Sequence, residues 1–305
     1  MTNQKVREHL KGVFPPLVTP FNRRGDIDLA RFRENVKYYV TTAVSGIVIA
    51  GSTGEAPYLT EQERLKLVEA ARGIVRPPQL LIISTGLEST LLTIKLSREA
   101  VARGADALLV ITPNYFKARM AEAATQLGYY RAVADSLRRP VLIYNIPQFT
   151  GIRLAPETIG ALSRHPNIAG LKESSGDLAY DRKILSSVRP GFRVFTGFPR
   201  VFLDVLRRGG AGGVLGQANY APELCVGIYD AFRNRQFRLA RDLQKRLTTL
   251  FEKVAVPFGV PGVKMAVEIC GLHGGAPRAP LAPLGARARK VISEALREAT
   301  QSLVF

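Results

Sequence analysis

Eight short apolar runs recur along the chain, and this repetition limits the folds that it can adopt. Each run has about the length of one β-strand. Most are continuous rather than alternating, which is typical of strands that are buried on both faces. We therefore predict eight buried strands in one sheet. The runs occupy residues 12–20, 45–52, 79–86, 105–113, 140–147, 168–174, 193–198 and 212–219.

The segments between these runs have a helical period. Residues 60–75 begin with Thr60 and carry Glu63 three positions later, a capping box, and apolar residues then follow along one face. Gly104 and Gly209 end two other helical segments, where glycine suits the left-handed cap before the next strand. Alternating strands and helices indicate parallel strands that are joined by crossover helices.

Eight strand–helix units within residues 1–221 predict a (β/α)8 barrel, the TIM barrel, which typically has about 250 residues. A doubly wound open sheet is the alternative, but no Gly-x-Gly-x-x-Gly motif follows the first run. Residues 222–305 continue as helical patterns, so we predict a C-terminal helical region packed on the barrel. No linker-like or low-complexity segment divides the chain.

Cysteine usage and hydropathy predict the cellular compartment of the protein and the redox state of its thiols. Cys225 and Cys270 lie in apolar stretches, with no histidine or second cysteine at metal-ligand spacing. We expect two reduced core thiols and no metal site. No segment resembles a signal peptide or reaches the length of a membrane span. We therefore expect a soluble, cytoplasmic protein that does not bind a membrane.

The formal net charge of +18 is the unusual feature of the composition. The Lys and Arg residues are scattered among helical patterns and form no basic block with interleaved aromatic residues, so we do not expect a nucleic-acid partner. If the chain did bind DNA, its retention would depend on salt. A basic field also attracts small anionic substrates.

Lys172 stands at the end of the sixth predicted strand, where an ammonium is unexpected. In a (β/α)8 barrel the reactive groups lie at the carboxyl ends of the strands. Side chains alternate along a strand, so if Leu171 faces the helices, Lys172 faces into the barrel. Desolvation there favours the neutral amine, the form that attacks a carbonyl to make a Schiff base. The chain has three histidines, which offer no convincing acid, base or metal site.

Hydroxyl groups follow neighbouring strands on the same rim. Tyr144 ends the fifth strand, where its hydroxyl can move protons at the carbon that Lys172 attacks. Ser52 and Thr53, in "GSTGE" after the second strand, precede the helix in which we place Glu55. Hydroxyls and backbone N–H groups at such a turn can hold a carboxylate.

Four motifs in this order resemble the Schiff-base pyruvate aldolases that include dihydrodipicolinate synthase and N-acetylneuraminate lyase. The resemblance extends over nearly the whole chain, since residues 258–281 are similar to the C-terminal helical region of that family. The motifs are "GSTGE" (51–55), "TPNYF" (112–116), "YNIPQFTG" (144–151) and "GLKESSG" (170–176).

The resemblance implies a role for each matching residue and no cofactor. Lys172 forms the imine with pyruvate or another 2-oxo acid, and Tyr144 relays protons. Tyr115 matches a tyrosine that enters the site of the neighbouring subunit to complete the proton relay, in a homotetramer built from tight dimers. The positions expected to bind substrate are Ser52, Thr53, Ser174, Gly197 and Val214.

One position departs from dihydrodipicolinate synthase. In that enzyme an arginine two residues after the proline of the strand-five motif binds the carboxylate of the aldehyde, and here Phe149 occupies that position. A phenyl ring cannot replace a bidentate guanidinium, which argues against lysine-pathway activity. Ala56 and Pro57 also stand where polar residues form the lysine-inhibition site of the family, so we do not expect feedback by lysine.

Several stretches look more like the 4-hydroxy-2-oxoglutarate aldolase branch, including "NYFKARM" and "LSRHPNIAGLKESSGD". In that branch a serine stands two residues after the Schiff-base lysine, and Ser174 matches it. We therefore expect a class I lyase that acts on a 4-hydroxy-2-oxo acid. Both 4-hydroxy-2-oxoglutarate and a 2-keto-3-deoxy sugar acid fit this expectation. Dihydrodipicolinate synthase activity, a 2-keto-3-deoxy acid dehydratase, and a 2-oxo acid sensor that forms the imine without turnover remain the alternatives.

Overall fold

The computed structural model describes residues 1–300, and its centre is a sheet of eight parallel strands. Every strand lies within one of the eight predicted apolar runs, so the prediction of eight strands is confirmed. The strands are β1 (Gly12–Val13), β2 (Gly46–Ile49), β3 (Leu80–Ser84), β4 (Ala107–Ile111), β5 (Val141–Asn145), β6 (Ile168–Glu173), β7 (Arg193–Thr196) and β8 (Gly212–Gly213).

The sheet closes on itself. Its strand order is β1-β8-β7-β6-β5-β4-β3-β2, and all of these pairs are parallel. The chain just after β1 then joins β2 through a parallel bridge between Pro16 and Val48. Val48 N donates to Pro15 O at 3.0 Å, and Leu17 N donates to Val48 O at 2.8 Å. The eight strands therefore form a barrel, as predicted.

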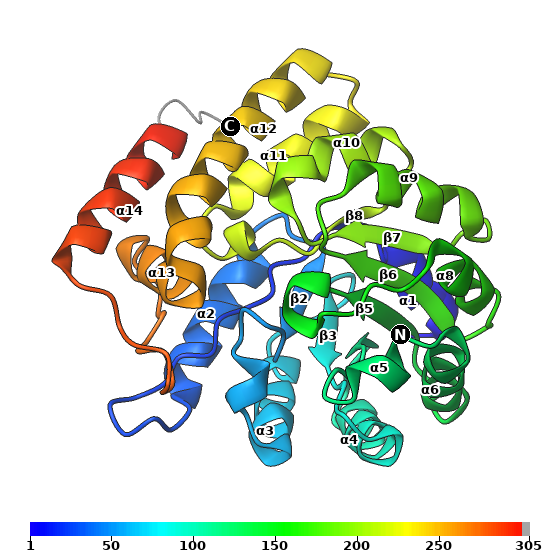
Figure 1. Cartoon of the computed structure of the whole chain (residues 1–305). Coiled ribbons are helices and arrows are strands. Elements are labelled where there is room, and N and C mark those ends of the chain that lie inside the picture. Colours follow the sequence, from blue (N-terminus) through cyan, green and yellow to red (C-terminus); the bar gives the residue numbers. More distant parts are fainter. Residues whose placement is uncertain (301–305) are drawn as a thin grey trace.

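Helices surround the strands and continue beyond them on one side (Figure 1). The helices up to β8 are α1 (Asn3–His9), α2 (Leu29–Thr41), η1 (Ala56–Tyr58), α3 (Glu61–Arg72), α4 (Thr90–Ala102), α5 (Lys117–Met120), α6 (Ala123–Asp135), α7 (Pro147–Thr150), α8 (Pro156–Ser163), α9 (Leu178–Ser187), η2 (Pro199–Val201) and α10 (Phe202–Arg207). After β8 follow η3 (Gly216–Asn219), α11 (Pro222–Arg233), α12 (Phe237–Leu250), η4 (Phe251–Ala255), α13 (Val256–Ile269) and α14 (Ala286–Thr300).

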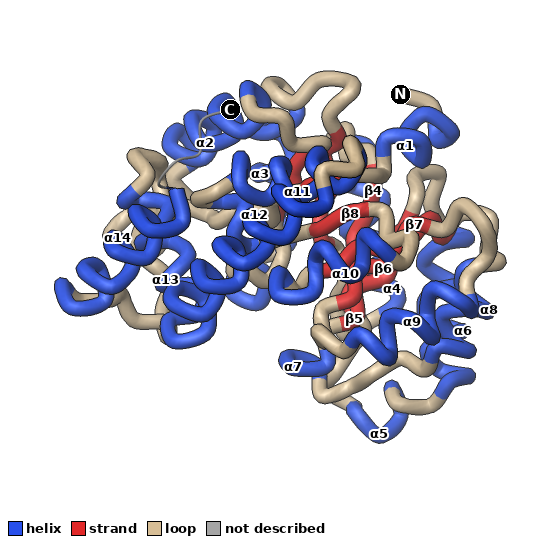
Figure 2. The backbone as a smooth tube through the Cα atoms, turned by 90° about the horizontal axis from the view of Figure 1, so that it is seen from above, coloured by secondary structure: helices blue, strands red, loops and turns tan. Residues whose placement is uncertain are grey.

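The core has two layers, because alternate residues of each strand face opposite sides. One apolar cluster fills the barrel and includes Phe14, Val48 and Phe195, and the other lies between the strands and the helices. Val6 and Leu10, from α1 and its C-terminal cap, belong to the interior cluster. Helix α1 therefore closes one end of the barrel, and Figure 2 shows it at the end opposite to α5 and α7.

The helix termini follow the predicted signals. Thr60 and Glu63 form a capping box at the start of α3, with Thr60 N donating to Glu63 Oε2 at 2.9 Å. Gly104 and Gly209 have φ values of 99° and 93°, a left-handed conformation that costs glycine little. Both predictions are confirmed.

The helices after β8 form the C-terminal extension. Helix α11 packs on β1 and on α12, and α14 packs on α12 and α13. The boundary after residue 221 stays a prediction, since α11 contacts both the barrel and the extension. Within residues 1–300, no helix has the length and apolar character needed to cross a membrane.

The two cysteines differ in their surroundings. Cys225 on α11 is buried, as predicted, whereas Cys270 at the end of α13 is exposed. The prediction of a core thiol is therefore wrong for Cys270, because the apolar residues before it face the core while the helix ends at the surface. Its sulfhydryl donates to Tyr220 O at 3.3 Å, and both cysteines are free.

Candidate active site

Lys172 lies at the carboxyl end of β6, and its side chain is only 4% exposed. It stands opposite Tyr144 of β5 and Phe195 of β7, which both belong to the interior cluster, whereas Leu171 belongs to the outer one. The predicted alternation is confirmed: Lys172 faces into the barrel. Its Nζ lies 4.1 Å from the centroid of the Tyr144 ring. Within residues 1–300 no carboxylate forms an ion pair with this amine.

Tyr144 is buried, and its hydroxyl lies 3.3 Å from Ser52 Oγ. Ser52 comes from the turn after β2, so this contact joins two predicted site residues that are 92 positions apart in the chain. Thr53, its neighbour, is half-buried, and its Oγ1 lies 3.7 Å from the point where a Cβ on Gly216 would be. The turn thus borders the end of β8 as well as β5.

Ser174 and Gly197 complete the surroundings of Lys172. A Cβ on Gly197 would lie 2.7 Å from Lys172 Cε and 2.1 Å from Ser174 Oγ. Only glycine leaves room at this position for both side chains. Ser174 is 5% exposed, and its Oγ has no hydrogen-bond partner within the described residues. A buried hydroxyl of this kind is available to a ligand.

The remaining predicted residues occupy different places. Val214 is buried in the interior cluster, and its N–H donates to Thr196 O at 2.9 Å. Phe149 on α7 is 66% exposed. Tyr115 is 78% exposed and packs edge-on against Phe116. Among the described residues, no hydrogen bond or ring contact joins the Tyr115 side chain to the other predicted site residues.

A cavity of about 810 Å³ opens beside this cluster. Ser52, Tyr144 and Phe149 line it, together with Asn114 and several apolar side chains. Lys172 does not line it, but its amine lies next to the ring of Tyr144, which does. The cavity has ample volume for a small organic acid.

Glu55, two residues after Thr53, has φ of 59° and precedes η1, so the prediction that it lies in a helix is wrong. Its buried carboxylate accepts from Lys264 Nζ at 2.6 Å and from Arg278 N at 2.8 Å. Burial lowers the pKa of Lys264, and the charge of Glu55 opposes that shift. This pair ties the "GSTGE" turn to the C-terminal extension.

We expect Lys264→Met to lower the free energy of unfolding by about 3–5 kcal/mol, because it leaves the Glu55 carboxylate buried without its partner. Urea denaturation measures the change. The control is Lys253→Met, which removes an exposed ion pair with Glu298 and should cost less than about 1 kcal/mol. If both variants lost the same free energy of unfolding, the buried Lys264–Glu55 pair would stabilise the fold no more than an exposed ion pair does.

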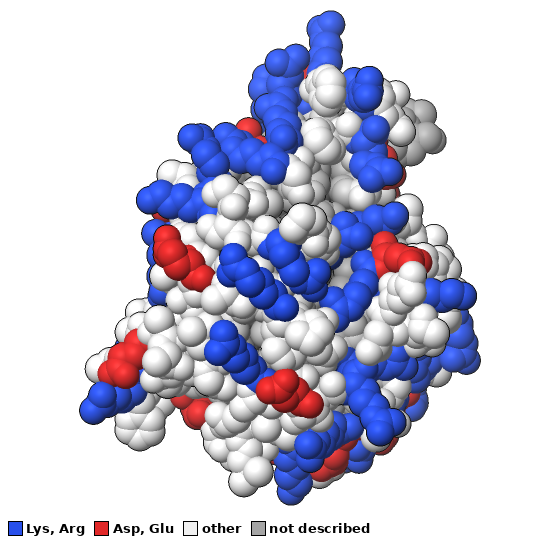
Figure 3. All heavy atoms as spheres, turned by 90° about the vertical axis from the view of Figure 1, so that its right-hand side faces the viewer, with Lys and Arg blue, Asp and Glu red and all other residues white. Residues whose placement is uncertain are grey.

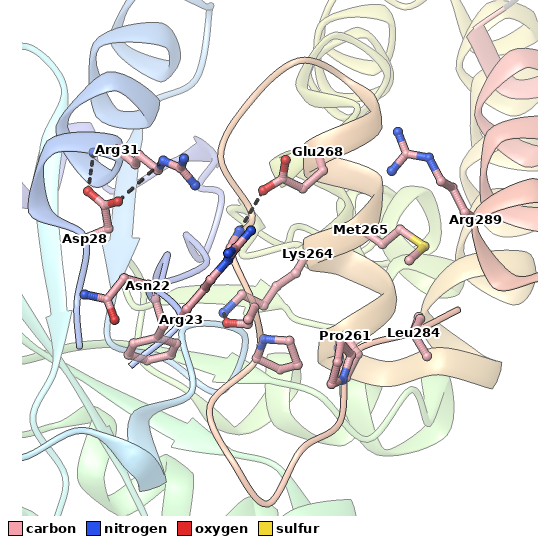
Figure 4. Close-up of a pocket in the computed structure, with 15 residues that line it drawn as sticks. Asn22, Arg23, Asp28, Arg31, Pro261, Lys264, Met265, Glu268, Leu284 and Arg289 are labelled. Carbon is pink, nitrogen blue, oxygen red and sulfur yellow. Dashed lines mark hydrogen bonds and ion pairs between the residues drawn. The ribbon is translucent and has the colours of Figure 1, made fainter. Parts of the chain in front are cut away.

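A second cavity, of about 570 Å³, lies between α2 and α13 (Figure 4). Arg23, Arg31 and Arg289 surround it, and Lys264 forms part of its wall. None of the predicted site residues lines it. We therefore place the candidate site at Lys172 and not in this cavity.

Two polar residues of the site region were missed by the sequence analysis. Asn145 follows Tyr144 and Glu173 follows Lys172, and both are fully buried. Asn145 Nδ2 donates to Glu173 Oε1 at 3.2 Å, and Asn145 Oδ1 accepts from Leu154 N at 3.2 Å. The available signal was a polar residue at the end of an otherwise apolar strand.

Most charged side chains are spread over the surface of the molecule. Figure 3 shows one face on which Lys and Arg outnumber Asp and Glu and are interspersed with uncharged surface. Such a surface gives a diffuse positive field rather than one basic groove. The field favours the approach of small anions from many directions.

Comparison with known proteins identifies the family of this chain. The profile of the dihydrodipicolinate synthetase family matches residues 9–299. The chain belongs to this family. It is therefore a lyase of the pyruvate-dependent, class I type that the family comprises.

Relatives within the family carry different names. The chain is 31% identical over 287 residues to a 4-hydroxy-tetrahydrodipicolinate synthase from Exiguobacterium sp., covering 94% of this chain and 97% of that protein. It is 34% identical over 302 residues to a probable mitochondrial 4-hydroxy-2-oxoglutarate aldolase from Emericella nidulans, covering 97% and 96%.

Solved structures of the family have the same fold. A dihydrodipicolinate synthase from Bacillus anthracis matches with a TM-score of 0.89 at 27% identity, over 97% of this chain and 99% of that one. A prophage protein of the dihydrodipicolinic acid synthase family from E. coli K12, solved in complex with pyruvate, matches with a TM-score of 0.88 at 28% identity, over 95% and 98%.

Proposed function

We propose that this protein cleaves or forms the C3–C4 bond of a 4-hydroxy-2-oxo acid, such as 4-hydroxy-2-oxoglutarate or a 2-keto-3-deoxy sugar acid, through an imine on Lys172. The observation that carries the proposal is the placement of a buried amine against a buried tyrosine. Lys172 Nζ lies 4.1 Å from the Tyr144 ring centroid, and the Tyr144 hydroxyl lies 3.3 Å from Ser52 Oγ.

The first step joins enzyme and substrate. The neutral Lys172 amine adds to the C2 ketone. The Tyr144 hydroxyl then donates its proton to the departing hydroxyl of the carbinolamine, which leaves as water, and a protonated imine and a Tyr144 phenolate remain. Lys172 is 4% exposed, so the imine forms in a site from which most water is excluded. The hydroxyls of Ser52 and Thr53 and the N–H groups of their turn hold the C1 carboxylate.

The second step breaks the carbon–carbon bond. The Tyr144 phenolate left by the first step accepts the proton of the 4-hydroxyl. The C3–C4 electron pair moves to the imine, which leaves a pyruvate enamine and an aldehyde. Protonation at C3 and hydrolysis then release pyruvate and the Lys172 amine. In the synthetic direction the same steps run in reverse.

Two residues support a 4-hydroxy-2-oxo acid as the substrate. Ser174 directs an unpartnered, buried hydroxyl toward the space next to Lys172, where it can contact the 4-hydroxyl or a distal carboxylate. Phe149 lines the cavity where dihydrodipicolinate synthase uses an arginine. The relative from Emericella nidulans named as a 4-hydroxy-2-oxoglutarate aldolase is in line with this choice.

The second candidate is 4-hydroxy-tetrahydrodipicolinate synthase activity, which condenses pyruvate with aspartate semialdehyde. Several relatives at 31–35% identity carry this name. Both candidates use the same imine and the same pyruvate enamine. They differ in the aldehyde, and Phe149 is the residue that disfavours this second candidate.

We also propose a homotetramer built from tight dimers, in which Tyr115 enters the site of the neighbouring subunit. Tyr115, Phe116 and Leu91 are each more than 70% exposed. Apolar groups that are exposed in this way are typical of an interface. In the assembly, Tyr115 extends the proton relay that begins at Tyr144.

A substrate panel tests the proposed reaction. Pyruvate release is measured from 4-hydroxy-2-oxoglutarate and several 2-keto-3-deoxy acids, beside the condensation of pyruvate with aspartate semialdehyde. We expect release from one or more of the 4-hydroxy-2-oxo acids and little condensation. Efficient condensation without release would favour the second candidate, and imine formation without any turnover would favour a 2-oxo acid sensor.

A further inference from the structure

Two buried carboxyl groups face each other directly behind the Lys172 strand. Glu173 is at the end of β6 and Asp181 is on α9, and both are fully buried. Each group shifts the pKa of the other, which places the two side chains next to each other. Within residues 1–300, Glu173 Oε2 and both oxygens of Asp181 have no N–H or O–H donor. The proposed reaction uses neither group.

One proton between the two groups explains two of these three oxygens, Glu173 Oε2 and one oxygen of Asp181. Two adjacent carboxylates away from water repel each other, so one of them retains a proton. That proton also supplies the missing donor, because a protonated carboxyl can donate to the other carboxylate. The arrangement then leaves no carboxylate oxygen of Glu173 without a partner.

The neighbours determine which group holds the proton. Glu173 Oε1 accepts from Ser175 N at 2.7 Å and from Asn145 Nδ2 at 3.2 Å. Such N–H donors stabilise the charged form of Glu173, whereas Asp181 has none. These donors favour the placement of the proton on Asp181, from which it can be donated to Glu173 Oε2.

The other charged groups nearby do not neutralise the pair. Asp177, at the start of α9, adds repulsion to Asp181, and Arg208 opposes it weakly. Arg208 lies near Asp204, and Arg153 is paired with Asp177 and covers the ring of Tyr180. Burial raises the pKa of both carboxyl groups, and that of Asp181 to about 7.

We propose that Glu173 and Asp181 share one proton, and that this pair positions the turn that carries Ser174 beside Lys172. Glu173 holds the turn through Ser175 N, and it also holds Asn145, whose carbonyl oxygen accepts from Ser174 N at 3.0 Å. Both are positioning residues, since neither touches the reacting atoms. The role of the turn rests on the proposed function, but the shared proton does not.

The shared proton makes the stability depend on pH in a defined direction. Asp181 keeps its proton in the folded chain up to a pH of about 7, whereas the unfolded chain loses it near the ordinary pKa of 3.8. The folded state thus binds the extra proton between these values, so its stability falls as pH rises through this window and levels off above it. Within this window the equilibrium constant for unfolding increases by up to about tenfold per pH unit.

Asp181→Asn tests the shared proton without substrate. The amide donates to Glu173 Oε2 at every pH, so we expect this pH dependence to disappear and the variant to be more stable than the wild type at pH 8. The control is Asp242→Asn, which changes an exposed aspartate on α12 and should follow the wild-type curve. Denaturation curves of Asp181→Asn and wild type that stay parallel from pH 5 to 8 would overturn the proposal.

Infrared spectroscopy gives a second measurement on the same proteins. At pH 6 the wild type should show the C=O stretch of one buried carboxylic acid that Asp181→Asn lacks. No difference between the two spectra in this band would mean that no proton is shared, and the proposal would fail.

Kinetics test the positioning role. Glu173→Ala should lower kcat/KM by about ten- to hundredfold, mainly through KM, because the turn loses its anchor. Glu173→Gln keeps an acceptor for Ser175 N and a donor for Asp181, and it should restore most of the loss. Equal KM values for Glu173→Ala and wild type would overturn the positioning role, as would a Glu173→Gln variant that is as impaired as Glu173→Ala.

The shared proton is tested independently of the proposed function. If the wild type turned over no substrate, the proposed function would fail, while the stability and infrared measurements would still decide whether Glu173 and Asp181 share a proton.

Discussion

Lys172→Ala should abolish both imine formation and turnover. Removing the amine removes the only group that the proposed mechanism uses to bind the ketone covalently, and kcat should fall by at least about 10⁴-fold. Borohydride reduction in the presence of pyruvate, followed by peptide mass spectrometry, measures the imine directly. We expect an adduct on the wild-type peptide that contains Lys172 and none in the variant.

The fold should survive this substitution. Lys172 is 4% exposed and has no ion-pair partner within residues 1–300, so its removal leaves no buried countercharge behind. Lys183→Ala is the matched control, since Lys183 is an exposed lysine on α9, and it should give the full adduct. An adduct that persists in Lys172→Ala would move the imine to another lysine and refute the mechanism.

The fold and the position of Lys172 could be predicted because they depend on local periodicity. Continuous apolar runs separated by helical segments specify a parallel barrel, and strand alternation then directs Lys172 inward and Leu171 outward. The rim position follows from the direction of the strands. These predictions do not require knowledge of the contacts between residues that are far apart in the sequence.

The contacts of the site depend on residues that are far apart in sequence, and they could not be predicted in this way. The partner of Glu55 is Lys264, 209 positions away, and a left-handed residue precedes η1 where a helix was expected. The Glu173–Asp181 pair joins a strand to the following helix through a turn whose geometry no periodicity specifies. The exposure of Cys270 likewise depends on where α13 ends.

The expected role of Tyr115 concerns the contact between two subunits and not the fold of one chain. Its ring is 78% exposed and packs edge-on against Phe116, and the role that the resemblance implies for it involves a neighbouring subunit. Sequence similarity can suggest such a role, but neither periodicity nor one folded chain can test it. The oligomeric state is therefore the measurement on which that part of the proposal depends.

Tyr144→Phe should separate imine formation from carbon–carbon cleavage. The variant keeps the ring beside Lys172 Nζ and loses only the hydroxyl that lies near Ser52 Oγ. Proton transfer by a positioned group contributes about 10²- to 10⁴-fold, and we expect kcat for cleavage to fall by that amount. The pyruvate adduct should form more slowly yet reach the wild-type yield on borohydride reduction.

Ser52→Ala is the matched comparison for Tyr144→Phe, because it removes the other hydroxyl of the same contact and leaves Tyr144 in place. We expect a smaller loss in kcat and a higher KM, since Ser52 binds the carboxylate in the proposed mechanism. Single-turnover measurements on the wild type, Tyr144→Phe and Ser52→Ala distinguish imine formation from carbon–carbon cleavage. Wild-type cleavage by Tyr144→Phe would show that another group accepts the 4-hydroxyl proton. A larger loss of kcat in Ser52→Ala than in Tyr144→Phe would exchange the roles assigned to the two hydroxyls.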